Sequence, residues 1–339
     1  MKKKTTTSGI VSGVLIVLSV TLSAASVRII QTNSAGDNIS IIDPATNTVV
    51  AEITGIEVNH GAAVTPDGSR FFFSDEAEHT LDVVSGKTLA VTKRIALSGR
   101  PNNIAISKDG RHVYVSIVSG TGAVDVIDAH SLERVKSIAT RGGVHNTFVT
   151  PDGVHVIAGS IAGKKLTVID GRTEEPLWSL DFDAGVRPIG FEKNADGSTR
   201  RLFVQLSDFH GFAIVDFATR RETGRVTLPD VPIEQRHTEG LQGSPSHGIG
   251  VAPDGKTLWV NSKMNSYVYA YSLPDLKLLG GVHVGDHPDW LTFTPDSRSV
   301  YVANAGSNSV SVVDVVSRKE VTKIPVGQVP KRNITAVLP

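Results

Sequence analysis

The sequence predicts an all-β protein, a seven-bladed β-propeller of four-stranded blades, on three observations. A turn motif recurs along the chain as TPDGSR, SKDGRH, TPDGVH, NADGST, APDGKT and TPDSRS. The aspartates of these turns follow one another at steps of 42, 43, 44, 58 and 42 residues. Each turn is followed by short runs rich in the β-branched and aromatic residues that strands prefer. Four short strands in a period of about 42 residues are the signature of a propeller blade.

The repeat divides the chain into complete blades at about 57–98, 99–141, 142–182, 183–231, 232–284 and 285–327. The N-terminal fragments VRIIQTN, NISIIDP and TVVAEIT supply three strands but no inner one, and the C-terminal KRNITAVLP supplies a single strand. We expect these two ends to pair in one sheet as the seventh blade. That pairing closes the ring and removes exposed strand edges.

The first 25 residues are typical of a signal peptide. Lys2, Lys3 and Lys4 precede the apolar run GIVSGVLIVLSVTL and the small residues SAAS. The alternative is an uncleaved anchor, but the run is shorter than the roughly 20 residues of a spanning helix. We therefore expect a single propeller domain over residues 26–339 that is periplasmic or secreted, monomeric and without a membrane span.

Composition narrows the classes of partner. The chain has 34 basic and 34 acidic residues, a net charge of zero and no cysteine. A neutral chain offers no broad cationic field, so we do not expect nucleic acid as a partner. Phosphate-binding loops, nucleophile elbows and HExxH helices are missing from the sequence.

The segments VYVANAGSNSVSVVD, PDGKTLWVNSKMNSYVYAYS and SKDGRHVYVSIVSGTGAVDVID carry a resemblance to a known family. They resemble the YVTN-repeat family of seven-bladed propellers, found in exported bacterial and archaeal proteins and related in fold to heme-d1-type and lactonase-type propellers. The resemblance implies the fold and export, but no particular reaction. Heme-d1 propellers use further domains and long axial-ligand segments that are not recognisable in this sequence, so we expect no heme.

Residues at one position of the repeat suggest a site. When the repeats are aligned backwards from the turn, the residues at the start of the inner strands are His60, Asn102, His145, Ile189, His247 and Asp289. The residues just before the nearby proline are Arg100, Arg187 and His287. Pseudo-symmetry carries such positions onto a ring at one face of the disc. We interpret His60, His145, His247 and His287 as ligands of a divalent transition metal, Cu or Zn. Arg100, Asn102 and Arg187 would bind a small anionic molecule. The alternative is structural, with each imidazole bonded to the backbone of the preceding blade.

The 58-residue step contains an insertion, VPIEQRHTEGLQGSPS at 231–246, directly before His247. Long loops on rigid scaffolds are usually functional. We expect this loop to cover the channel mouth and to bring His237 and Glu239 there, where they and Asp289 would act as acid or base.

Two functions remain open on the sequence. One is an exported protein that binds a metal or small anionic ligand at a histidine-lined channel mouth and acts as a metal-dependent enzyme of undetermined reaction. The other is a non-catalytic scaffold whose top face recognises a protein or a glycan.

Overall fold

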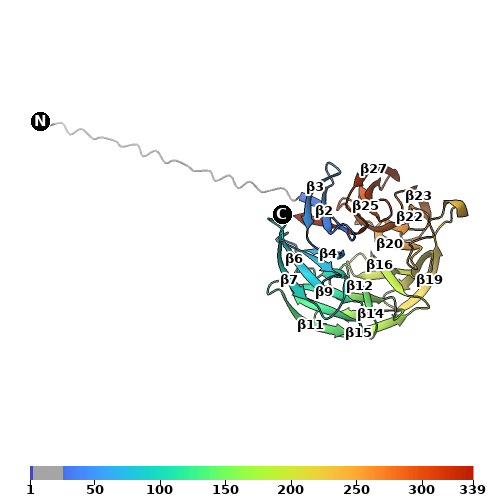
Figure 1. Ribbon diagram of the computed structural model, residues 1–339, viewed down its shortest axis with the longest axis horizontal. Helices are drawn as coiled ribbons and strands as arrows, with labels where there is room; N and C mark the ends of the chain where they lie inside the picture. The colour runs from blue at the N-terminus through green and yellow to red at the C-terminus, as the bar shows by residue number, and fades with distance from the viewer. Residues whose placement is uncertain (3–25, 339) are drawn as a thin grey trace.

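The chain forms a ring of seven four-stranded antiparallel sheets around a central channel (Figure 1). This computed structural model describes residues 1–2 and 26–338, so nearly all of the expected signal peptide lies outside the described residues. No helix in the described part of the chain is long and apolar enough to cross a membrane. The predicted seven-bladed propeller is thereby confirmed.

The strands of the six continuous blades, innermost first, have the following bounds. The first three of these blades are β4 (Asn59–Val64), β5 (Arg70–Asp75), β6 (Thr80–Ser85), β7 (Val91–Ala96); β8 (Pro101–Ile106), β9 (His112–Ile117), β10 (Ala123–Asp128), β11 (Glu133–Ala139); β12 (Val144–Val149), β13 (His155–Ser160), β14 (Lys165–Asp170), β15 (Pro176–Asp181). The next three are β16 (Val186–Lys193), β17 (Thr199–Leu206), β18 (Gly211–Asp216), β19 (Arg221–Thr227); β20 (Ser246–Val251), β21 (Thr257–Ser262), β22 (Tyr267–Ser272), β23 (Leu278–His283); β24 (Pro288–Phe293), β25 (Ser299–Asn304), β26 (Ser309–Asp314), β27 (Lys319–Pro325). A short 3-10 helix, η1 (Ile233–Gln235), lies in the insertion.

The seventh blade joins the two ends of the chain, as predicted. Its strands, from the channel outward, are β28 (Pro330–Leu338), β1 (Ser26–Asn33), β2 (Asn38–Asp43) and β3 (Thr48–Thr54). Strand β28 pairs antiparallel with β1, with Ile30 opposite Ile334 and Gln31 opposite Asn333. The ring is therefore closed by hydrogen bonds between residues about 300 positions apart in the sequence.

The repeated turn has one local cause. In the first copy, Asp67 Oδ1 accepts hydrogen bonds from Thr65 Oγ1 at 2.6 Å and from the Ser69 backbone N–H at 3.0 Å. Gly68 then takes a φ of 66°, which glycine adopts without steric cost. The aspartate and the following residue, glycine in five copies and Ser297 in the sixth, thus form the turn of the repeat.

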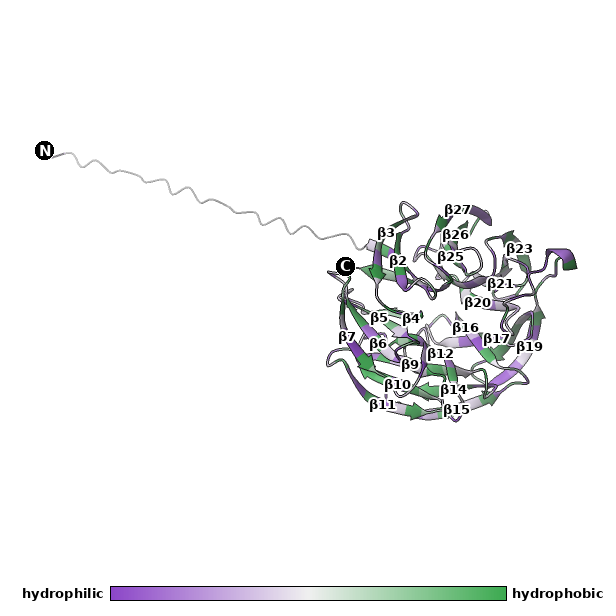
Figure 2. Cartoon of the chain, viewed as in Figure 1, coloured by the Kyte–Doolittle hydropathy of each residue, from purple (hydrophilic) through white to green (hydrophobic). Residues whose placement is uncertain are grey.

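Apolar residues occur in strands all around the ring (Figure 2). They form clusters between neighbouring blades, such as the one in which Trp259 and Val268 of one blade meet Leu291 and Val302 of the next. Because these layers fill the space between sheets, side chains at the start of the inner strands are the ones left to face the channel.

Candidate functional site

The inner strands share a register that defines a ring of side chains. In each blade the first residue of the inner strand lies opposite the last residue of the second strand, as for Asn59 and Asp75 or Ser246 and Ser262. The pairing is irregular just after that point, at the second residue of the strand. We call these second residues the channel ring. They are His60, Asn102, His145, Arg187, His247, Asp289 and Lys331.

The structure places five of the six aligned residues in the channel ring, and at the sixth position the ring residue is Arg187 instead of Ile189. Val186 lies opposite Leu206 and Ile189 opposite Val204, so Arg187 is the equivalent of His247, and Ile189 lies two residues further into the strand. The alignment failed here because β16 and β17 are each eight residues long rather than six. Counting back from the turn therefore stopped two residues short of Arg187. Lys331, from the split blade, completes the ring.

A second set of positions, directly after the second strand of each blade, was missed from the sequence. In five blades this residue is uncharged: Ser34, Val118, Ile161, Ser207 or Ala305. In the β4–β7 blade it is the acidic Glu76, and in the β20–β23 blade it is Lys263. Aligning the repeat at this position reveals Glu76 and Lys263 as the two charged exceptions. Each of them contacts the channel ring.

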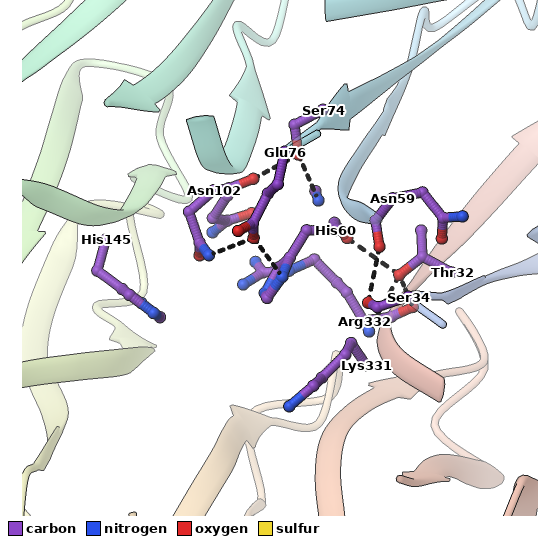
Figure 3. Close-up of polar contacts among 12 residues, drawn as sticks. Thr32, Ser34, Asn59, His60, Ser74, Glu76, Asn102, His145, Lys331 and Arg332 are labelled. Atoms are coloured by element: carbon purple, nitrogen blue, oxygen red, sulfur yellow. Dashed lines mark hydrogen bonds and ion pairs between the residues drawn. The ribbon is translucent and has the colours of Figure 1, made fainter. Parts of the chain in front are cut away.

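Glu76 gathers the ring residues of two neighbouring blades. Its Oε1 lies 2.9 Å from His60 Nδ1 and accepts a hydrogen bond from Asn102 Nδ2 at 2.9 Å, and its Oε2 lies 3.7 Å from Arg100 Nη1 (Figure 3). Burial alone would raise the pKa of Glu76, but His60, Arg100 and Asn102 outweigh it and hold the pKa below its usual value. Arg100 is about half exposed and lies at the outer edge of the site.

Asp289 is the second buried carboxylate. Its Oδ2 lies 3.0 Å from Lys263 Nζ and 3.4 Å from Lys331 Nζ, and its Oδ1 lies 3.1 Å from His247 Nδ1. Burial would raise the pKa of Asp289, but His247, Lys263 and Lys331 together hold it well below its usual range. Asp289 is therefore ionised and already shared among three donors, which makes it a poor proton donor.

His145 presents an N–H to the channel. Arg332 Nη2 donates to Asn146 Oδ1 at 3.1 Å, so the other end of that amide, Nδ2, is the donor that lies 2.9 Å from His145 Nδ1. Removal from bulk water lowers the pKa of His145 well below 6.5, and the charges of His60 and His247 lower it further. A neutral imidazole that accepts at Nδ1 carries its proton on Nε2. His145 Nε2 is thus a donor.

His247 has the opposite tautomer. Its Nδ1 lies 3.0 Å from the Asp289 backbone oxygen and 3.1 Å from Asp289 Oδ1, two acceptors, so Nδ1 carries the proton. Burial lowers the pKa of His247 to about 4 despite the opposing effect of Asp289. His247 Nε2 therefore holds a lone pair.

Side chains other than the imidazoles perform most of the structural bonding between blades. Thr32 Oγ1 donates to the His60 carbonyl at 3.0 Å, and Ser116 Oγ donates to the His145 carbonyl at 3.1 Å. Among the ring imidazoles in the described residues, only His247 contacts the backbone of a neighbouring blade, at the Asp289 carbonyl of the next blade rather than the preceding one. Figure 3 shows His145 and His60 extending toward one another, with ring centroids 6.4 Å apart.

The insertion at 231–246 reaches the channel ring. Arg187 Nη2 donates to the Gln242 carbonyl at 2.7 Å, while Arg187 Nε donates to Ser207 Oγ at 2.9 Å. The His237 ring lies 5.8 Å from that of His287, and its Nε2 is 3.9 Å from Asp286 Oδ1. Burial and the nearby charges of Lys263 and His237 lower the pKa of His287. Glu239 is exposed, and no contact in the described residues brings it to the ring.

Positive charge exceeds negative charge around the channel. Arg187, Lys263 and Lys331 are the cations at the channel ring, whereas Glu76 and Asp289 are the carboxylates that contact it. This leaves an excess of one positive charge at the ring. Desolvated cations of this kind attract anions more strongly than exposed ones do.

The four predicted metal ligands do not come together as one set. Within residues 26–338, no three His, Asp or Glu side chains come together in a way that could hold a metal ion. His145 accepts from Asn146 at Nδ1 and carries its proton on Nε2, so the four predicted ligands do not form one donor set.

Comparison with known proteins agrees with the fold. Residues 27–189 match the family described as the cytochrome D1 heme domain. The structure of Kuenenia stuttgartiensis hydrazine synthase is similar, with a TM-score of 0.71 and 21% identity over 85% of this chain and 92% of that chain. The structure of a dihydro-heme d1 dehydrogenase in complex with DHE gives a TM-score of 0.62 and 16% identity, over 90% of this chain and 74% of that chain.

The Pseudomonas aeruginosa periplasmic gluconolactonase gives a TM-score of 0.73 and 19% identity, over 93% of this chain and all of that chain, 100%. Curated proteins include no sequence match to this chain. The chain is thus a seven-bladed β-propeller related in fold to the cytochrome D1 heme domain and to lactonase-type propellers. At these identities the structural likeness establishes the fold alone.

Proposed function

We propose that this protein is an exported propeller that binds a small organic anion at the channel ring. The observation that carries the proposal is the excess of desolvated cations beside an imidazole, His145, whose free nitrogen is a donor. A carboxylate placed there would receive hydrogen bonds from His145 Nε2 and Lys331 Nζ. Charge-assisted bonds of this kind are about twice as strong as neutral ones.

Arg187 and the insertion supply the cover of the proposed site. Arg187 has two of its N–H groups fixed by Ser207 and Gln242, which leaves the rest of the guanidinium for a ligand. The Gln242 contact ties the loop to the ring at the same time. Binding of an anion to Arg187 would therefore also hold the loop in place.

Catalysis is a second candidate, and His247 is the reason to consider it. A carboxylate, Asp289, orients its Nδ1–H and leaves the Nε2 lone pair available to take a proton from water or substrate. However, a pKa of about 4 makes His247 a weak base at neutral pH. Hydrolysis of an anionic ester or lactone would need the bound substrate to raise that pKa, so binding is the better-supported function.

The resemblance to YVTN-repeat proteins and the lysine-led apolar N-terminus support export to the periplasm or beyond. A protein or glycan partner at the top face is the alternative to a small molecule. Buried charges concentrated inside the channel favour the small molecule, because a flat partner surface would not reach them.

Calorimetric titration with gluconate tests the proposal, since the ring offers donors for both carboxylate and hydroxyl groups. We expect saturable binding at one site, and at least about tenfold weaker binding to Lys331→Met. Arg298→Met, which removes a cation that is 83% exposed, is the matched control and should bind normally. The proposal would be wrong if gluconate bound neither the wild type nor the variants. If elemental analysis of the purified protein also found stoichiometric Zn or Cu, the metal site would take its place.

A further inference from the structure

Directly below the channel ring, two side chains separate the two ends of the channel. The Arg332 guanidinium stacks on the Trp290 ring, with Cζ 3.6 Å from the ring centroid, and Trp290 in turn meets the His247 ring at 5.7 Å. Both belong to the third position of an inner strand. Trp290 and Arg332 thus lie between the polar ring and the opposite half of the channel.

That opposite half contains a cavity of about 500 Å³. Its walls are mostly apolar and come from the inner strands, and none of the channel-ring residues lines it. Phe148 stacks parallel to Trp290 at 6.5 Å and meets Phe191 edge-on at 5.7 Å. The size and the aromatic lining are those of small-molecule sites.

The polar groups at this cavity are incompletely bonded. Arg332 is 3% exposed, and its guanidinium makes one side-chain hydrogen bond within the described residues, to Asn146. Arg332 Nε, Thr147 Oγ1 and Asn333 Oδ1 are buried without a partner there. A buried polar group without a partner costs about 1–3 kcal/mol, so a ligand group that bonded to the guanidinium would be favoured here.

We propose that this cavity is a second binding site, for a small aromatic carboxylic acid whose ring lies against Phe148 and Trp290 and whose carboxylate faces Arg332. The carboxylate would accept from the guanidinium, and the aromatic body would cover the apolar walls. Burial lowers the pKa of Arg332 only to about 9, so it is a cation at neutral pH. The site is distinct from the channel ring and does not depend on the function proposed for it.

Titration with 2-naphthoate, followed by calorimetry and by tryptophan fluorescence, tests this site. We expect saturable binding of 2-naphthoate and at least about tenfold weaker binding of the uncharged 2-naphthalenemethanol. Arg332→Met should remove that preference for the acid while retaining the alcohol. Lys331 is next to Arg332 in the sequence but belongs to the channel ring. The Lys331→Met variant should therefore bind 2-naphthoate like wild type.

A second variant protects the test against misfolding of Arg332→Met. Ala105 lies at the cavity wall and is only partly buried, so Ala105→Phe fills the space without removing the guanidinium. It should lose binding of both compounds and keep a urea unfolding midpoint in the range expected for a folded protein, near that of the wild type. Equal binding of acid and alcohol by wild type, no saturable binding, or unchanged naphthoate affinity in folded Ala105→Phe would overturn the proposal.

Discussion

Lys263 and Asp289 form a buried ion pair across two neighbouring blades, with Nζ 3.0 Å from Oδ2 and both side chains 4% exposed. Removing one member of a buried pair leaves the other charge uncompensated, which costs about 3–5 kcal/mol. His247 and Lys331 still contact Asp289, so we expect the lower end of that range. Lys263→Met should lower the free energy of unfolding by about 3 kcal/mol in urea titrations.

Lys256 and Asp254 provide the matched control for that prediction. Their Nζ–Oδ2 distance is 3.8 Å, but Lys256 is 80% exposed. Lys256→Met should change stability by less than about 1 kcal/mol. If the two variants were equally stable, the ion pair would not contribute to holding the blades together.

Stability should fall as the solution is acidified below the pKa of an unfolded histidine. The folded pKa of His247 is lowered to about 4, so between about 6.5 and 4 the unfolded chain takes up a proton that the folded protein does not. The stabilisation is complete above pH 6.5 and is lost by about 3 kcal/mol over that window. Urea titrations across this range should show a shallower dependence for His247→Gln.

His130 is the control for the pH experiment because it is exposed in a turn. His130→Gln should keep the wild-type slope. A slope that His247→Gln leaves unchanged would mean that His247 is protonated in the folded protein.

The contact between Arg187 and Gln242 should determine how firmly the insertion is held. Without the guanidinium, the Gln242 carbonyl loses its charged donor, and residues 238–243 have few other bonds to the ring. We expect Arg187→Met to raise amide hydrogen exchange in this segment by about tenfold or more. Exchange in β20 should be unchanged, and protection of the loop equal to wild type would contradict the role given to Arg187.

Anion affinity should increase as pH falls from about 8 to 5. A bound anion stabilises protonated His145 and His247, so binding takes up protons, and the affinity can rise by at most about tenfold per pH unit for each proton. Calorimetry in buffers of different ionisation enthalpy measures this uptake directly. Proton release on binding would instead indicate a metal or a different site.

The fold could be predicted from the sequence because its signals are local and repeated. Asp67 and Gly68 form their turn through contacts within five residues, and a similar turn recurs in the six continuous blades. The closing blade could also be predicted, because the N-terminal fragment supplies three strands and the C-terminal fragment supplies the inner strand that is missing from it.

The site could be predicted only in part. His60, His145 and His247 have equivalent places in the repeat, but the two extra residues in β16 displaced Arg187 from its place in the alignment. Glu76 and Lys263 were missed because they follow the second strand rather than begin the first. Which nitrogen of His145 carries the proton depends on Arg332, which is 187 positions away in the sequence. The spacing of the histidines indicates a metal ligand at His145, but this tautomer does not favour one.

A crystal structure of the protein grown with gluconate tests the central claim most directly. We predict density for gluconate in the channel ring, with its carboxylate within hydrogen-bond distance of His145 Nε2 and Lys331 Nζ and with Arg187 and Gln242 in place above it. Gluconate found only outside the channel, or a metal ion bound by His60, His145 and His247 in its place, would contradict the proposed function.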